Sequence, residues 1–308
     1  MLTRGRPRTA RLGASLVGKF LLCVLTVVML TVCAARATAG PAPEPDPVRL
    51  KPATLTAFEH YVQLTETRKD EELRRGEVFL WVDSLPQPQR AQAYAQLRQG
   101  QVRIERLETH DSGRPIPCPD GLIHHWVGVI FVTAATLEQT LRLVQDYDHH
   151  ASYFAPDVMR SKILKHNGND YHIYLRFLRK KAMITVVLDT EHEVHYFPID
   201  ATHVRSQSLT TRVAEVENHD RPDERQKPVD DGGGYLWRMN TYWRFLERDG
   251  GTYVQCESIS LTRDIPRGLG LLVGWLVNSV PRESLTFTLT ATRAALNHKR
   301  PPSPSRQN

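Results

Sequence analysis

The sequence is poor in the residues and spacings that build small metal sites and disulfide frameworks. It has four cysteines in 308 residues, and two of them, Cys23 and Cys33, lie in an apolar N-terminal stretch. The other two, Cys118 and Cys256, have no CxxC spacing and no matching set of histidines, so we expect no structural zinc site. Two distant cysteines set no framework, and the sequence leaves open whether they pair.

The chain also lacks the short motifs of common enzyme classes. It contains no GxSxG elbow, no Walker loop, no HExxH helix and no dinucleotide-binding glycine pattern. Histidines, acids and serines are frequent enough that a triad could be imagined in many places, so the sequence assigns no catalytic residue. We expect no cofactor and no metal, and binding is favoured over catalysis.

Excess positive charge is confined to the N-terminus. Residues 1–39 hold six of the 40 basic residues and no acidic one, so the remaining 34 basic residues face all 34 acidic ones. A mature chain without net charge lacks the electrostatic footprint of a phosphate-binding protein. We therefore expect no nucleic-acid partner.

The first 39 residues have the three parts of an export signal. A basic start precedes the apolar run 20–35, and the small residues Ala-Thr-Ala at 37–39 precede Gly40. We predict a signal peptide over 1–39 and a periplasmic or secreted protein. An uncleaved membrane anchor is the alternative, although the apolar run is short for a hydrocarbon core of ~30 Å.

The rest of the chain divides into segments of different composition. Prolines are dense over 40–53, which predicts a linker. Helical spacing of apolar residues over 54–117 predicts an N-terminal helical segment that is too small to form its own core. Residues 118–298 are rich in strand formers, and 299–308 are expected to be a disordered tail.

The pattern over 118–298 predicts a long strand, a helical excursion, consecutive antiparallel strands and a terminal helix from about Pro281. Strands followed by helices set to one side indicate an α+β fold rather than a parallel array. Such a sheet tends to curl round the terminal helix and leave an interior space. The polar loop 218–233 is expected to be exposed and mobile.

Two passages resemble START-like, or SRPBCC, proteins. They are LRLVQDYDHHASYFAPDVMRSKILKHNGNDY and LTRDIPRGLGLLVGWLVNSVPRESLTFTL, and the resemblance covers about 120–297. It implies a helix-grip fold, in which a curved seven-stranded antiparallel sheet wraps round a long C-terminal helix and encloses a cavity for an apolar ligand. The N-terminal helical segment and the loop 218–233 depart from the minimal family pattern.

The acidic and aromatic stretch 146–156 is predicted to be a gate or lid corner at the open end of the sheet. Its adjacent His149 and His150 point apart and have no third ligand spaced with them, so a metal site is not expected. Its aromatic rings are expected to pack, while its acids and imidazoles stay in water.

One face of the last strand pair is the candidate ligand face. If Glu247 lies opposite Thr252, large rings on one strand face small side chains on the next. The opposite face would carry Arg238, Arg244 and Glu257 as a surface network. Ordinary core packing is the alternative to a ligand pocket. The candidate ligand-binding residues, including one each from the first strand and from the segment before the terminal helix, are Trp126, Trp237, Met239, Trp243, Cys256, Ser258 and Trp275.

Two further features bear on function. His124 and His125 alternate along a strand, so one must face inward, as a polar handle for a ligand or as a bonded core residue. The segment 265–281 is apolar but interrupted by glycines, which favours a loosely held turn or short helix. It could open as a lid toward a membrane surface, giving transient membrane contact, or serve as a buried connector.

These patterns predict an exported protein that holds a lipid or another apolar small molecule in an internal cavity. Two alternatives stay open. One is a cyclase or hydratase acting on a hydrophobic substrate on the same fold, and the other is a non-catalytic interaction protein.

Overall fold

The computed structural model describes residues 48–76, 78–181, 184–264 and 270–298. Its helices are α2 (Pro52–Arg75), η1 (Trp81–Ser84), α3 (Gln89–Arg98), α4 (Leu137–Val144), η2 (Tyr147–His149), α5 (His150–Tyr153) and α6 (Gly270–His298), whose side chains are described from residue 279 onward. Its long strands are β5 (Gly121–Thr133), β6 (Val158–Asn167), β7 (Asp170–Lys181), β8 (Ile184–Pro198), β9 (His203–Glu217), β12 (Arg238–Arg248) and β13 (Gly251–Arg263). Its short strands are β1 (Val48–Arg49), β2 (Arg103–Arg106), β3 (His110–Asp111), β4 (Arg114–Pro115), β10 (Arg225–Gln226) and β11 (Asp231–Gly232).

The seven long strands form the predicted antiparallel sheet, and the α+β class is confirmed. The strand order is β2-β5-β13-β12-β9-β8-β7-β6, with β10 paired to β9, so the sheet has nine strands in the described part of the chain. The two strands beyond the seven long ones come from segments that depart from the minimal family pattern. The N-terminal segment supplies β2, and the polar loop 218–233 supplies β10.

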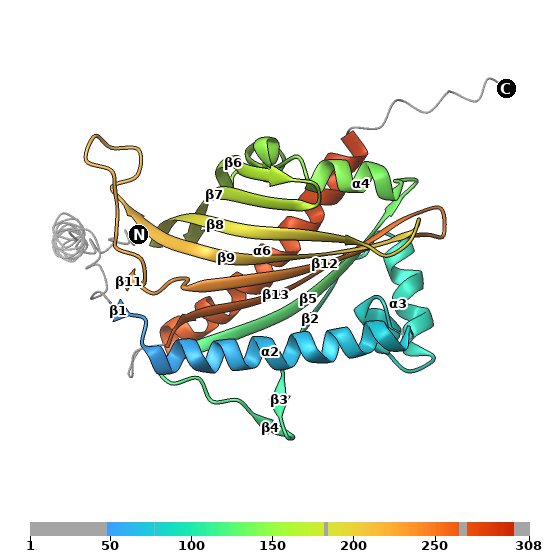
Figure 1. Cartoon of the computed structure of the whole chain (residues 1–308), viewed down its shortest axis with the longest axis horizontal. Helices are drawn as coiled ribbons and strands as arrows, with labels where there is room; N and C mark the ends of the chain where they lie inside the picture. The colour runs from blue at the N-terminus through green and yellow to red at the C-terminus, as the bar shows by residue number, and fades with distance from the viewer. Residues whose placement is uncertain (1–47, 77, 182–183, 265–269, 299–308) are drawn as a thin grey trace, which may run out of the picture. The chain divides into compact units, whose positions relative to one another are not determined.

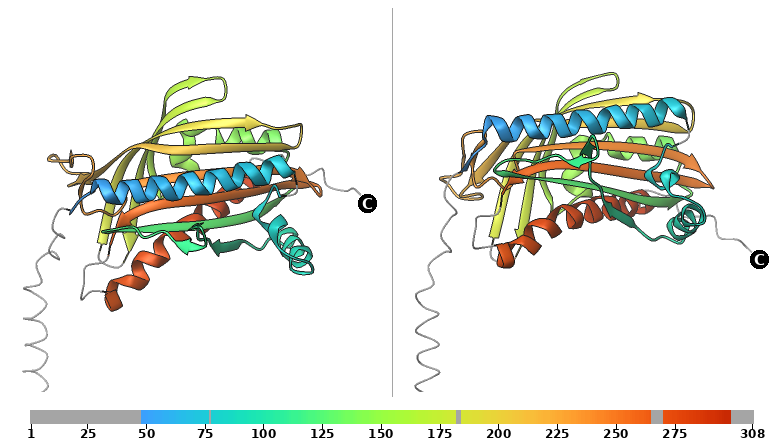
Figure 2. Two further views of the ribbon diagram at one scale, coloured as in Figure 1. Left: turned by 60° about the horizontal axis from the view of Figure 1, so that its bottom comes forward. Right: turned by 90° about the horizontal axis from the view of Figure 1, so that it is seen from below.

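Two long helices lie on opposite faces of this sheet, as the two views of Figure 2 show. We call the face toward α6 the inner face and the face toward α2 the outer face; in Figure 1 α2 crosses in front of the strands and α6 behind them. Gly128 of β5 lets α6 approach closely, because a Cβ there would lie 2.4 Å from Leu289 Cδ1. The terminal helix therefore covers the sheet as a helix-grip fold requires.

The inner-face core is closed where α6 crosses β5 and its neighbours. Ile130, Val254 and Phe245 are fully buried there, and Leu285 and Leu289 of α6 join the same cluster. Val254 lies opposite both Ile130 and Phe245 in the register, and Leu285 and Leu289 are four residues apart on the helix, so each set shares one face. This packed end fixes α6 on the sheet.

The outer face carries two smaller cores that belong to the N-terminal segment. One joins α3 and η1 to Phe131 and Tyr253, and the other joins α2 to Tyr242, Ile259 and Leu261. The N-terminal helices thus share the sheet's core.

The terminal helix is longer than the sequence predicted. It begins at Gly270 rather than near Pro281, which lies inside it, so the expectation of a turn or short helix over the whole of 265–281 was wrong for residues 270–281. A proline removes one backbone hydrogen bond and strains the preceding turn, but packing of the following turns against the sheet holds this helix. Residues 265–269 lie outside the described ranges.

In the stretch 146–156 the aromatic rings pack as predicted, but one of the two histidines is buried instead of lying in water. Tyr147 and Phe154 are buried, and the Tyr147 and Tyr196 hydroxyl oxygens lie 2.8 Å apart. His150 was expected to stay in water, but it is buried and its Nε2–H donates to the Val144 carbonyl at 3.1 Å. The chain turns through η2 and α5 here, so the buried residues Tyr147, His150 and Phe154 recur every three or four positions and share one face.

The polar loop 218–233 is held to the sheet at several points. Glu224 accepts a hydrogen bond from buried Arg176 at 2.8 Å, and the Gln226 amide donates to Asp189 at 2.6 Å. Arg176 and Asp189 are themselves paired through two bonds of 2.7 and 2.8 Å. The loop therefore covers part of the outer face of β7 and β8, where mobility was expected.

Among the helices of the described ranges, none is both long enough and apolar enough to serve as a membrane span.

Candidate ligand site on the inner face

The predicted register of the last strand pair is confirmed. Glu247 lies opposite Thr252, and this pairing continues to Trp243 opposite Cys256 and Thr241 opposite Ser258. Because Cys256 belongs to the cluster that packs on α6, the ring-bearing face is the inner face. The sequence left the choice of face open, and the packing of α6 decides it.

Four of the predicted ligand residues share this face and are not fully buried. Trp126, Met239, Trp243 and Ser258 are all half-buried, whereas the neighbouring positions toward the closed end of the sheet are buried. Cys256 is buried among them as a free thiol, and burial raises its pKa. A thiol that is neutral and enclosed serves as an apolar lining group rather than a nucleophile.

Trp237 does not share the face of Trp243. It precedes β12, and its backbone N–H donates to the Leu261 carbonyl at 2.8 Å. Its ring is buried with Ile259 and Leu261 in the α2 cluster on the outer face. The prediction assumed that strand alternation continues back to residue 237, but the strand ends at Arg238.

Trp275 lies in α6, and its side chain falls outside what the structure describes. The predicted lid of residues 265–281 is therefore described only in its helical backbone from Gly270 onward. Its contact with a membrane stays a prediction.

His124 is the inward histidine and His125 the outward one. His124 is opposite Ser260 on the inner face, and its Nε2 lies 3.0 Å from Thr262 Oγ1. Burial lowers the pKa of His124 to about 4. An imidazole that stays neutral and bonded in this way matches a polar handle or core residue better than a proton carrier at neutral pH.

The outer face holds a buried chain of polar groups where the sequence predicted a surface network. The Thr109 amide donates to the Tyr61 hydroxyl at 2.8 Å, and that hydroxyl donates to His125 Nδ1 at 2.9 Å. His125 Nε2 donates to Glu257 at 2.9 Å, and Lys69 donates to the other Glu257 oxygen at 2.6 Å. This arrangement fits a neutral His125, because burial lowers its pKa, and an ionised Glu257.

Burial and pairing set the charges of this chain. Burial disfavours the Glu257 carboxylate, but the charge of Lys69 and the hydrogen bond from His125 outweigh it, so the pKa of Glu257 lies below its ordinary value. Burial lowers the pKa of Lys69 to about 8, partly offset by Glu257. Burial also lowers the pKa of His125. Lys69 and Glu257 are therefore both charged at pH 7.

The predicted partners of Glu257 make other contacts. Arg238 pairs with Asp230 at 2.7 Å, and buried Arg244 donates to the Phe79 carbonyl at 2.6 Å. The surface network was wrong because α2 covers this face, and Lys69 reaches Glu257 from that helix. Lys69 lies four residues after buried Thr65 and eight after Tyr61, a helical spacing that could have identified it.

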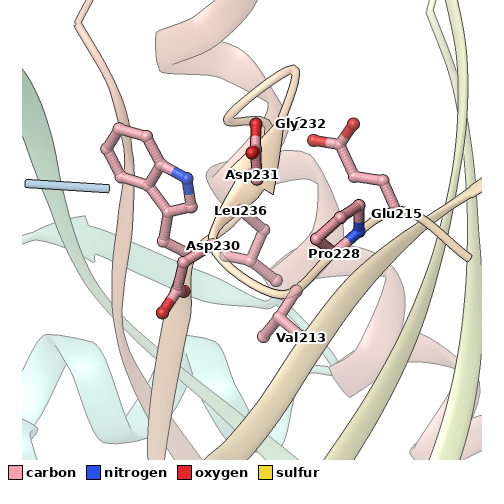
Figure 3. Close-up of a pocket in the computed structure, with 8 residues that line it drawn as sticks. Val213, Glu215, Pro228, Asp230, Asp231, Gly232 and Leu236 are labelled. Carbon is pink, nitrogen blue, oxygen red and sulfur yellow. The ribbon is translucent and has the colours of Figure 1, made fainter. Parts of the chain in front are cut away.

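A shallow depression lies near the end of β9 (Figure 3), and Trp237 is among the residues that line it. It is lined by Glu215, Asp230 and Asp231 together with apolar side chains, and its enclosed space is about that of one water molecule. The Glu215 carboxylate accepts a hydrogen bond from the Gly233 amide at 2.7 Å. The depression is too small for an apolar ligand.

The sequence missed a set of hydroxyl groups on the inner face. Ser206 and Ser208 of β9 share a face with Thr241, which lies opposite Ser208. The signal was present in VRSQSLT, where serines alternate with larger polar residues, but only the strand order shows that β9 lies beside β12.

Within the described residues, no three His, Cys, Asp or Glu side chains are grouped so that they could hold a metal ion.

The antiparallel sheet and the terminal helix on its inner face define a helix-grip fold. The strand order and the position of α6 carry that assignment. No protein-family model matches the sequence, and no curated protein matches it.

Several solved structures are similar to the chain. One is a STAR-related lipid transfer protein from Xanthomonas axonopodis, at 16% identity and a TM-score of 0.42, covering 63% of this chain and 98% of that one. Another is human STARD10, at 11% identity and a TM-score of 0.42, covering 70% and 82%. A third is the Zhui aromatase/cyclase from Streptomyces, at 13% identity and a TM-score of 0.39, covering 58% and 96%. These values concern the fold and carry no conclusion about the ligand.

Proposed function

We propose that this protein binds a lipid or another apolar small molecule between the inner face and α6, and that it does so after export. The observation that carries the proposal is that Trp126, Met239 and Trp243 stay partly exposed on a face that a helix covers. Burial of apolar surface stabilises by about 25 cal/mol per Å². Large rings that stay partly exposed beside a closed core are typical of the lining of a ligand site.

The first test is the content of the purified protein. Full-length protein purified without detergent is extracted with organic solvent, and the extract is analysed by mass spectrometry. A roughly stoichiometric apolar molecule is expected, and an extract that contains none, from protein that also takes up no apolar probe, would contradict the proposal.

Trp126→Ala and Trp243→Ala are each expected to weaken binding of the neutral probe N-phenyl-1-naphthylamine at least ~10-fold, which corresponds to about 1.4 kcal/mol. The physical reason is the loss of a large apolar contact on the inner face. Probe emission against protein concentration gives the affinity. Trp81→Ala is the matched control, because Trp81 is also half-buried but packs on the outer-face cluster. Equal losses in all three variants would place the probe elsewhere.

Export is proposed from the leader alone. N-terminal sequencing of protein recovered from the cell envelope or medium is expected to begin near Gly40. An intact Met1 on envelope protein would favour an uncleaved anchor and remove the export half of the proposal.

A further inference from the structure

We infer that the ligand is uncharged and carries hydroxyl or carbonyl oxygens, which bind to a row of hydroxyl groups across three neighbouring strands. The inference rests on the proposed function and specifies the chemistry of its ligand. The hydroxyl row consists of Ser258 on β13, Thr241 on β12 and Ser208 on β9.

The register places the three residues side by side on the inner face. Thr241 lies opposite Ser258 on one side and opposite Ser208 on the other. Neighbouring strands are about 4.8 Å apart, so the row spans roughly 10 Å. All three residues are half-buried, and within the described part of the chain none of their hydroxyls has a hydrogen-bond partner.

Ser206 gives an independent indication of the same chemistry. It lies two residues before Ser208 on the same face, between Trp243 and Tyr196 in the register. It is 4% exposed, and its Oγ has no hydrogen-bond partner among the described residues. Buried hydroxyls are normally paired, so an unpaired one beside the row points to a polar atom supplied from outside the chain.

The strands that carry the hydroxyl row and their neighbours offer it no charge on the inner face. The inner-face positions along β12 from Met239 to Phe245, and the positions of β5, β13 and β9 that pair beside them, include no Asp, Glu, Lys or Arg. Arg106 of the edge strand β2 shares this face, but it is exposed and lies opposite Trp126, two strands away from Ser258. Glu247, at the end of β12, accepts the Leu137 amide at 2.6 Å. A carboxylate or phosphate placed at the row would lose water without gaining a counter-ion. Removing a hydroxyl or carbonyl oxygen from water costs much less free energy than removing an ionised group.

The aromatic residues beside the row favour a flat ligand. Trp126 lies opposite Ser258, and Trp243 is the next inward residue after Thr241. Indole rings pack well on rigid ring systems. A rigid ligand with oxygens about 5 or 10 Å apart would match neighbouring or alternate hydroxyls of the row.

The test uses delipidated full-length protein and three probes that share one ring system: pyrene, 1-pyrenebutanol and 1-pyrenebutyrate. At pH 7.5 the alcohol is expected to bind at least ~10-fold more tightly than the carboxylate, and about threefold more tightly than pyrene. Tighter or equal binding of the carboxylate would overturn the inference while leaving an apolar site. Failure of all three probes to bind would overturn the proposed function as well.

Variants locate the oxygen-binding groups. Thr241→Val, which keeps the side-chain shape, and Ser258→Ala are expected to abolish the preference for the alcohol over pyrene and to leave pyrene affinity within ~2-fold. Thr67→Val is the control, because its hydroxyl is exposed on α2 and bonds only its own helix. Melting temperatures verify that each variant folds. A preference that survives in both row variants would overturn the assignment of the row.

Discussion

Lys69→Met is expected to lower the free energy of unfolding by about 3–5 kcal/mol, because it leaves the Glu257 carboxylate buried without its counter-ion. The Lys69 and Glu257 side chains are only 8% and 6% exposed, and their charged atoms lie 2.6 Å apart. His125 can still donate to Glu257, but a neutral imidazole does not replace a charge. Urea unfolding at pH 7.5 measures the loss.

The double variant Lys69→Met, Glu257→Gln tests the cause of that loss. Gln keeps the acceptor for His125 and removes the charge, so at least half of the lost stability should return. No recovery would mean that Lys69 acts through the packing of α2 rather than through charge. Arg142→Met on α4 is the matched surface control. Its partner Glu138 is 78% exposed, and a change below about 0.5 kcal/mol is expected.

Acid is expected to unfold this protein between about pH 6.5 and pH 4. Burial lowers the pKa of His124, His150 and His192 from 6.5 to about 4. Between these two pH values the three imidazoles are protonated in the unfolded chain but stay neutral in the folded chain. The free energy of unfolding therefore falls as pH falls. Each histidine contributes about 1.4 kcal/mol per pH unit. Below the ordinary pKa of Glu257 the unfolded chain also protonates that carboxyl while the folded chain keeps it ionised, so the free energy of unfolding falls further.

Urea unfolding at pH 7.5, 6.0, 5.0 and 4.5 measures this slope. His192→Gln is expected to reduce this slope by about 1.4 kcal/mol per pH unit, because it removes one imidazole whose pKa is lower in the folded chain than in the unfolded chain. His60→Gln is the control, since His60 is exposed on α2 and pairs with Asp111 at its surface. A profile that is flat from pH 7.5 to 4.5 would contradict the prediction.

The local pattern predicted the strands and their pairing in the last strand pair. Side chains alternate strictly along β12 and β13, so a single assumption, Glu247 opposite Thr252, placed Met239, Trp243 and Cys256 on one face. The same periodicity failed at Trp237, because alternation holds only while the chain stays in the strand. It also failed to find where α6 begins, because glycine and proline weaken a helix but tertiary packing overrides them.

The sequence by itself determined the fold class, the balance of charge after residue 39, and which side chains share a strand face, because these depend on composition or on residues close together in the chain. Only the tertiary structure decided which face is the inner one, because that depends on where α6 and α2 pack. It also brought Lys69 to Glu257, 188 residues away, and set Ser258, Thr241 and Ser208 in one row. Such groupings follow from strand order and burial, which no local spacing encodes.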